Sequence, residues 1–250
     1  MIKSNSIYFK ILENIKNTKL LRQSNVTLLA VSKKTNIENI KCLYDLGQKD
    51  FGENYVDELI EKANLLNKDI NWHFIGHLQS NKAKKVLSIK NMTTISSVDS
   101  YKLASVIDTI CQKLYRKVDI YIQVNISEEE TKSGVKYYDA AKLYADIYKN
   151  LKNINLKGIM SLGEIGNEEQ FEKLYQLKLI ICNNLKLNIN EVGISNGTSN
   201  DYKVAIDYGS TQVRIGTILF SKYENELSDK NHIENELNKI NKNINVNNNI

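Results

Sequence analysis

Short apolar runs alternate with longer amphipathic stretches between residues 26 and 222, and this alternation constrains the fold more than any other feature. Near-continuous apolar runs are typical of parallel strands, and the amphipathic stretches between them are typical of helices that cover a sheet. Eight such units in about 200 residues predict an α/β protein, a single (β/α)₈ TIM barrel rather than an open doubly wound sheet. The runs are VTLLAVS from Val26, KDFGEN from Lys49, NWHFIG from Asn71, MTTISSV from Met92, VDIYIQVNI from Val118, NLKGIMSLG from Asn155, EVGIS from Glu191 and TQVRIG from Thr211.

Two flanking segments complete the predicted organisation. Apolar residues at roughly helical spacing, with lysines between them, predict an extra N-terminal helix within residues 1–25 that packs on the barrel at residues 26–222. Residues 223–250 are rich in Asn and Lys and end in NKNINVNNNI. That composition predicts a partly disordered tail, to which we assign no function.

The composition excludes several classes of function. Basic residues number 34 and acidic residues 29, and this mild excess argues against a nucleic-acid partner, so we interpret Lys82, Lys84 and Lys85 as a solvated helix face. No apolar run approaches the roughly 18 residues of a membrane span, so no membrane association is predicted. Charged residues such as Lys10 and Glu13 interrupt the first twenty positions, unlike the apolar core of a signal peptide. We therefore expect a cytoplasmic protein.

Candidate functional residues stand where the predicted strands end, because active sites of such barrels lie at the carboxyl ends of the strands. His73 and His77 are four residues apart, which would suit a metal only on a helix, and Gly76 between them argues against one. No metal site is therefore predicted. The other candidates are Ser32 to Lys34 after the first strand, Gly52 to Tyr55 at the second, Gln79 after the third, Met160 at the sixth, Ser195 to Asp201 after the seventh, and Arg214 to Thr217 at the eighth.

The loops after the last two strands are candidates for a phosphate site. Barrels most often bind phosphate there, through backbone N–H groups. The first loop reads S-N-G-T-S-N-D and the second R-I-G-T, so both offer hydroxyl groups and glycine. Either alone could be an ordinary helix cap, but two such loops at the two expected positions indicate a phosphate ligand.

A lysine follows the otherwise apolar first strand, where a buried ammonium group would be costly unless it is paired, neutral or covalently used. Strict alternation places Lys33 on the face of Leu29 and Val31 and points Lys34 to the opposite side, so one of them faces the barrel mouth. A lysine near a phosphate site suits a Schiff base, and pyridoxal 5′-phosphate (PLP) supplies both an aldehyde and a phosphate. An ordinary surface lysine stays open as the alternative.

Several motifs in fixed order resemble the pyridoxal phosphate homeostasis protein family. The resemblance covers about residues 26–222, and the motifs fall on seven of the eight strand positions. They are AVSK at Ala30 to Lys33, FGENY at Phe51 to Tyr55, WHFIGHLQ at Trp72 to Gln79, N-I-S-x-x-x-x-K-S-G at Asn125 to Gly134, GIM at Gly158 to Met160, S-x-G-x-S-x-D at Ser195 to Asp201, and VRIGT at Val213 to Thr217.

The resemblance implies a barrel similar to the N-terminal domain of alanine racemase, with PLP as the cofactor. Lys33 would form the Schiff base, and Arg214 would stand beside the pyridine nitrogen. Asn54 and His73 would line the mouth near the ring. The phosphate would be held by hydroxyls and backbone N–H groups of Ser199, Gly216 and Thr217.

The sequence departs from the common family pattern in two places. Thr35 stands where family members often have a second lysine, so Lys34 would have to substitute for that lysine from a different face. In the phosphate loop, Asn196 and Thr198 replace residues that are commonly methionine, which leaves the loop hydroxyls intact. Neither departure argues against PLP binding.

Two function classes compete. An arginine beside the pyridine nitrogen keeps it unprotonated and weakens the electron sink, and after the helix and tail no residues are left for a second domain. We therefore predict a PLP carrier or buffer in vitamin B6 homeostasis, a monomer without catalytic residues, with PLP-dependent apo-enzymes as candidate recipients. A small PLP-dependent amino-acid racemase or lyase is the alternative. A third candidate is a barrel enzyme that acts on a sugar phosphate without PLP, and it stays open only if Lys33 is not modified.

Overall fold

A computed structural model describes residues 7–18, 22, 25–129 and 132–220. The Asn- and Lys-rich segment at 223–250, which we expected to be a partly disordered tail, lies outside the described residues. So do most of the positions that join the first helix to the first strand.

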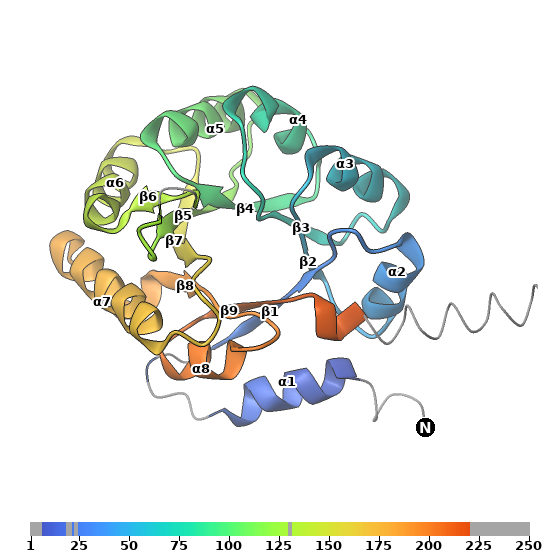
Figure 1. The fold of residues 1–250 in the computed structure, drawn as a ribbon. Coiled ribbons are helices and arrows are strands. Elements are labelled where there is room, and N and C mark those ends of the chain that lie inside the picture. The colour runs from blue at the N-terminus through green and yellow to red at the C-terminus, as the bar shows by residue number, and fades with distance from the viewer. Residues whose placement is uncertain (1–6, 19–21, 23–24, 130–131, 221–250) are drawn as a thin grey trace, which may run out of the picture.

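Eight parallel strands close into a barrel, as the sequence predicted, and helices surround it (Figure 1). Around the barrel the order is β1-β2-β3-β4-β5-β7-β8-β9, and β9 pairs again with β1. Each of these strands falls within one of the eight apolar runs. Their bounds are β1 (Thr27–Val31), β2 (Asp50–Glu53), β3 (Asn71–Phe74), β4 (Met92–Val98), β5 (Asp119–Asn125), β7 (Asn155–Ser161), β8 (Gly193–Ser195) and β9 (Gln212–Ile215).

One further strand, β6 (Val135–Lys136), was not expected. It adds to β5 through the pairs Val124 with Val135 and Asn125 with Lys136, and it lies outside the closed ring of eight. The next helix starts only at Tyr137, because Val135 and Lys136 pair with the sheet before the chain turns.

Three of the described α-helices begin at Asn or Ser caps. Asn36, Ser100 and Asn167 each accept a hydrogen bond from the backbone N–H three residues ahead. None of the helices among the described residues has the length and apolar character that a membrane crossing requires. The helices are α1 (Ile7–Asn17), α2 (Ile37–Asp45), α3 (Val56–Leu65), α4 (Ala83–Leu87), α5 (Tyr101–Lys113), α6 (Tyr137–Asn150), α7 (Glu168–Leu185) and α8 (Tyr202–Asp207), with short 3₁₀ turns η2 (Ser80–Lys82) and η3 (Ile189–Glu191).

The hydrophobic core lies between the barrel and the helices. Ala30, Phe51 and Trp72 occupy matching positions on β1, β2 and β3 and are fully buried. Because strand side chains alternate, the residues between them point into the barrel. These interior residues include the buried polar side chains of His73 on β3 and Arg214 on β9.

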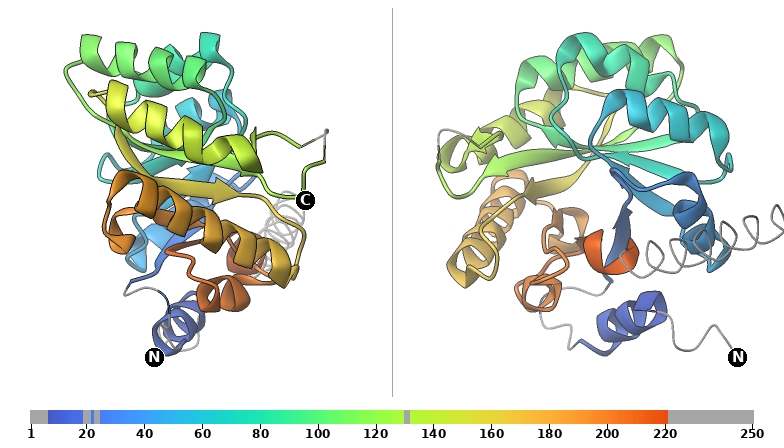
Figure 2. Two further views of the ribbon diagram at one scale, coloured as in Figure 1. Left: turned by 90° about the vertical axis from the view of Figure 1, so that its left-hand side faces the viewer. Right: turned by 45° about the vertical axis from the view of Figure 1, so that its right-hand side comes forward.

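Helix α1 packs on the outside of the barrel beside α8 (Figures 1 and 2). Tyr8, Ile11 and Ile15 form its buried stripe. Asn14 Nδ2 donates to the hydroxyl of Tyr202, the first residue of α8, over 3.0 Å. This contact places the N-terminal helix near the loop after β8.

Candidate functional site

A pocket of about 430 Å³ lies at the carboxyl ends of the strands. It lies just beyond the ends of β1, β2, β3, β7, β8 and β9, where we expected the site. The volume falls within the roughly 300–1,000 Å³ that is usual for small-molecule sites. Six of the seven predicted site residues line this pocket: Lys33, Asn54, Ser199, Arg214, Gly216 and Thr217.

Arg214 on β9 supplies a fixed positive charge to the pocket wall. Its Nη1 donates to the carbonyl oxygen and the hydroxyl of Ser195, at 2.6 and 2.9 Å, and its Nη2 donates to the carbonyl oxygen of Ser161 at 2.8 Å. These acceptors are neutral, so burial dominates and lowers the pKa of Arg214 to about 10, against a weaker opposing effect of Asp201. The guanidinium group therefore stays rigid and is available to a ligand acceptor.

Asp201 shapes the loop between β8 and α8. Its Oδ1 accepts from the backbone N–H of Thr198 at 2.7 Å and from the Thr198 hydroxyl at 2.9 Å. Gly197 has a φ of 91°, which a residue with a side chain rarely adopts. Since Asp201 already engages Thr198, the next residue, Ser199, is the loop hydroxyl that we expect to reach a ligand.

The last turn of the pocket wall depends on Gly216. A Cβ atom at this position would come within 2.9 Å of the carbonyl oxygen of Val31 on the neighbouring strand. The missing side chain lets the chain after β9 pass close to β1. Gly216 and Thr217 therefore reach the same pocket as Lys33.

Lys33 and Lys34 both line the pocket, and both are exposed. The expectation that Lys34 lies on the opposite side from Lys33 is therefore wrong, because both residues line the same pocket. The reason is that β1 ends at Val31 and the chain then turns, with Lys34 in a left-handed conformation at a φ of 59°. Strict alternation applies only within a strand, so it does not govern these residues.

A buried polar network, which the sequence analysis missed, holds this turn in place. Lys62 Nζ on α3 donates to Glu53 Oε1 at 2.8 Å, to Glu58 Oε1 at 2.6 Å and to the carbonyl oxygen of Ser32 at 2.7 Å. Glu58 Oε1 also accepts from the backbone N–H of Lys34 at 2.6 Å.

Glu53 lies at the centre of that network and is fully buried. Burial raises its pKa, and the hydrogen bonds and charge of Lys62, together with Ser32, oppose that shift. The signal in the sequence was a glutamate inside an apolar strand, with a lysine nine residues later on a predicted helix.

Asn54 presents a buried acceptor at the pocket. Its Oδ1 has no hydrogen-bond partner among the described residues. Gly76 fixes this residue from behind, because a Cβ atom there would lie 2.1 Å from the carbonyl oxygen of Asn54. An unpartnered buried acceptor at a pocket indicates a place for a ligand donor.

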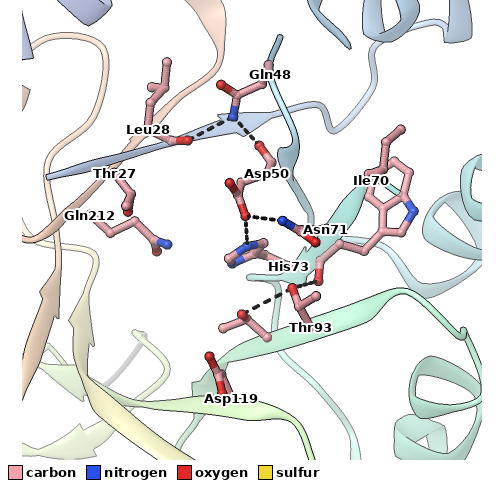
Figure 3. Close-up of polar contacts among 12 residues, drawn as sticks. Thr27, Leu28, Gln48, Asp50, Ile70, Asn71, His73, Thr93, Asp119 and Gln212 are labelled. Carbon is pink, nitrogen blue, oxygen red and sulfur yellow. Dashed lines mark hydrogen bonds and ion pairs between the residues drawn. The ribbon is translucent and has the colours of Figure 1, made fainter. Parts of the chain in front are cut away.

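His73 does not reach this pocket, contrary to our expectation. Its Nε2 lies 3.0 Å from Oδ1 of Asp50, the first residue of β2, and Asn71 donates to the same oxygen at 3.2 Å. Figure 3 shows these side chains facing one another inside the barrel, with Thr27 and Gln212 across the same space. The family resemblance implied a place for His73 at the mouth, but its ring lies nearer the amino ends of the strands, and Ile75 lines the pocket instead.

Asn125, Lys132 and Ser133 of the fourth motif line a second, adjacent hollow of about 330 Å³. Asn125 Nδ2, at the end of β5, donates to the carbonyl oxygen of Glu129 at 2.7 Å. The hollow shares Asn54, Ile75 and Leu162 with the main pocket. This motif therefore forms one side of the same barrel mouth.

The two histidines of the third motif have separate partners. His77 Nδ1 lies 3.6 Å from Asp99 and is exposed, whereas His73 is buried against Asp50. Within the described part of the chain, no three His, Cys, Asp or Glu side chains gather in a way that could hold a metal ion.

The fold and the pocket define the class of protein first. The profile of the alanine racemase N-terminal domain matches residues 9–224. The solved alanine racemase of Clostridium difficile superposes with a TM-score of 0.62 at 21% identity, over 83% of this chain and 55% of that enzyme. The chain therefore has the barrel of the alanine racemase N-terminal domain.

Two closer relatives narrow the class to a family. The pyridoxal phosphate homeostasis protein of Schizosaccharomyces pombe is 38% identical over 215 residues, which cover 84% of this chain and 89% of that protein. PipY of Synechococcus elongatus, solved with PLP bound, is 30% identical with a TM-score of 0.69, over 84% of this chain and 99% of PipY. The chain belongs to the pyridoxal phosphate homeostasis protein family.

Proposed function

We propose that this protein holds PLP through a Schiff base on Lys33 and acts as a PLP carrier or buffer. One observation supports the proposal most directly: a lysine amine, a buried arginine and two hydroxyl-bearing loops line a single pocket of about 430 Å³. The S. pombe relative is named for pyridoxal phosphate homeostasis, and the PipY structure is described with PLP bound.

The residues of the pocket fit the chemical groups of PLP. When bound, PLP supplies an aldehyde that condenses with an amine and a ring that accepts electrons. Lys33 offers the amine, and Ser199, Gly216 and Thr217 offer hydroxyl and backbone donors to the phosphate. Arg214 has guanidinium donors for the ring nitrogen. Asn54 presents the buried Oδ1 that lacks a partner among the described residues.

A carrier fits the geometry better than a catalyst. Both Lys33 and Lys34 are exposed, so solvent and a second amine can reach the bound aldehyde. Catalysis by PLP generally requires groups that exclude water and move protons on both faces of a substrate. Apart from the strands and helices of the barrel, the described residues belong mainly to α1. This helix packs beside α8 rather than over the pocket, so it does not supply such groups.

Borohydride trapping tests the proposed lysine. The protein is incubated with PLP, reduced and mapped by mass spectrometry, beside the variants Lys33→Ala and Lys34→Ala. We expect label on Lys33 in the natural protein, loss of the label in Lys33→Ala, and retention in Lys34→Ala. Label that persists elsewhere in Lys33→Ala at the original stoichiometry would show that the assignment is wrong.

The same preparation separates a carrier from an enzyme. The loaded protein is incubated for many hours with a set of L-amino acids, and products are followed by chiral chromatography. A carrier leaves the amino acids unchanged, whereas a racemase or lyase produces D-isomers or deaminated products. A modified Lys33 excludes the sugar-phosphate enzyme that would work without PLP.

The remaining functional predictions concern partners. We propose that PLP passes from Lys33 to PLP-dependent apo-enzymes, that the protein is a monomer, and that it is cytoplasmic. Transfer is measured as recovery of activity by a PLP-free enzyme mixed with the loaded protein, with free PLP scavenged. Light scattering after size exclusion gives the oligomeric state.

A further inference from the structure

A second and larger cavity lies at the opposite end of the barrel. Its volume is about 970 Å³, and its walls include Thr27, Asn155 and Gly193, the first residues of β1, β7 and β8. The carboxyl-end pocket is lined instead by residues that follow the strands. The two cavities share no lining residue, so they are separate sites.

Four lysines line the larger cavity, against one carboxylate. The carboxylate is Glu191, whose Oε2 also accepts from the backbone N–H of Asn188 at 2.6 Å. Among the lysines, Lys157 lies 3.7 Å from Asp119, which offsets part of its charge. The lysines are Lys117, Lys152, Lys157 and Lys178.

Lys178 carries the argument furthest because it is buried without a partner. It lies on the core-facing stripe of α7, between Leu174 and Ile181, and only 1% of its surface is exposed. In the part of the chain that the structure describes, its ammonium group makes no hydrogen bond or ion pair. Burial lowers the pKa of Lys178, whereas the nearby Cys182 opposes that shift. A buried ammonium group without a counterion is unfavourable, so its position favours an anion in the cavity.

The rest of the lining suits the organic part of a ligand. Tyr121, Tyr148 and Leu156 present ring and alkyl surface, and Asn190 provides an amide. Burial raises the pKa of Tyr121 to about 12, so its hydroxyl stays neutral and can donate a hydrogen bond. The volume is at the upper end of the roughly 300–1,000 Å³ of small-molecule sites, and an inorganic ion would occupy little of it.

We propose that the cavity at the amino ends of the strands binds a small organic phosphate, with the phosphate dianion seated against Lys178. Lysine binds phosphate as a point charge, and the surplus of lysines over carboxylates favours a dianion over a monoanion. The surrounding tyrosines and aliphatic side chains cover the organic body. The site is a binding site and not a second reaction centre, and it does not depend on PLP binding at Lys33.

Calorimetric titration with phenyl phosphate tests the proposal. The natural protein, Lys178→Met and Lys173→Met are compared; Lys173 lies on the same helix but is exposed and paired with Glu169. We expect Lys178→Met to bind about 10- to 100-fold more weakly, because it loses a charged hydrogen-bond donor. We expect Lys173→Met to bind like the natural protein. Phenol, which lacks the phosphate, should not bind at this site.

Two outcomes would overturn the proposal. Equal affinity in Lys178→Met and the natural protein would place phenyl phosphate elsewhere, and loss of its binding in Ser199→Ala alone would assign it to the carboxyl-end pocket. Absence of any binding to the natural protein would also exclude the site. If Lys178→Met does not fold, Lys152→Met gives the answer, because Lys152 is exposed and its removal should still weaken binding severalfold.

Discussion

Among the described residues, two lysines are buried at opposite ends of the barrel, and their surroundings differ. Lys62, 4% exposed, donates to two carboxylates and one carbonyl oxygen beside the Lys33 turn. Lys178, 1% exposed, has no such acceptor among the described residues and faces the larger cavity. One charge is neutralised within the protein, whereas the other is left for a ligand.

This difference separates structural charge from functional charge. A buried ammonium group whose donors are paired fixes local geometry, and at Lys62 that geometry is the turn that presents Lys33 and Lys34 to the pocket. A buried charge without a partner lowers the stability of the free protein, and ligand binding can recover that loss. Removal of the buried lysine should therefore destabilise the protein at the Lys62 end and stabilise it at the Lys178 end.

The largest effect is expected at Lys62. Lys62→Met leaves the Glu53 carboxylate buried without its cation and should lower the free energy of unfolding by about 3–5 kcal/mol. Urea denaturation at pH 8 measures this loss. The exposed pair Lys142 and Asp146 provides a matched control, and Lys142→Met should unfold like the natural protein.

The sign of the pH dependence follows from Glu53. Burial raises the folded-state pKa of Glu53 above the unfolded value of about 4.3, so the folded state takes up the proton first as pH falls. The protonation of Glu53 in the folded protein therefore contributes stability that is fully present below the unfolded pKa. This stability is lost as pH rises through the folded pKa. The deficit of Lys62→Met should therefore be smaller at pH 5 than at pH 8, and an equal deficit would contradict this explanation.

At Lys178 the effect should be smaller and opposite. Lys178→Met replaces an unpaired buried ammonium group by an apolar side chain of similar length, so in phosphate-free buffer it should stabilise the protein by about 1–2 kcal/mol. Because burial lowers the folded pKa of Lys178, the amine in the folded protein is neutral at high pH, and the gain should shrink towards pH 10. Destabilisation at pH 7 would indicate that Lys178 has a partner within the protein.

The smallest effect is expected at His73. A variant at this position tests whether His73 belongs to the carboxyl-end site. His73→Gln weakens the contact with Asp50 and should cost about 1 kcal/mol of stability. PLP affinity should stay within about twofold, because the His73 ring does not line the pocket. Fluorescence titration with PLP measures this, and a tenfold loss would place His73 in the site.

Sequence patterns determined the barrel and most of the carboxyl-end pocket. Eight apolar runs gave eight parallel strands, and the carboxyl ends of such strands necessarily meet at one end of the barrel. Residues directly after strands, such as Lys33, Asn54 and Gly216, were therefore identified from their positions in the chain. The pattern could not reveal β6, because two residues show no periodicity.

Only the tertiary structure decided how deep each side chain lies in the barrel and which group each charge pairs with. Alternation places His73 inside the barrel, but pairing with Asp50 sets its depth, and a left-handed turn brings Lys34 to the pocket. The sequence places Lys62 and Lys178 on helices in the same way. Whether a buried lysine meets carboxylates or an open cavity depends on elements distant in the chain, because electrostatic pairing is set by distances that local periodicity does not contain.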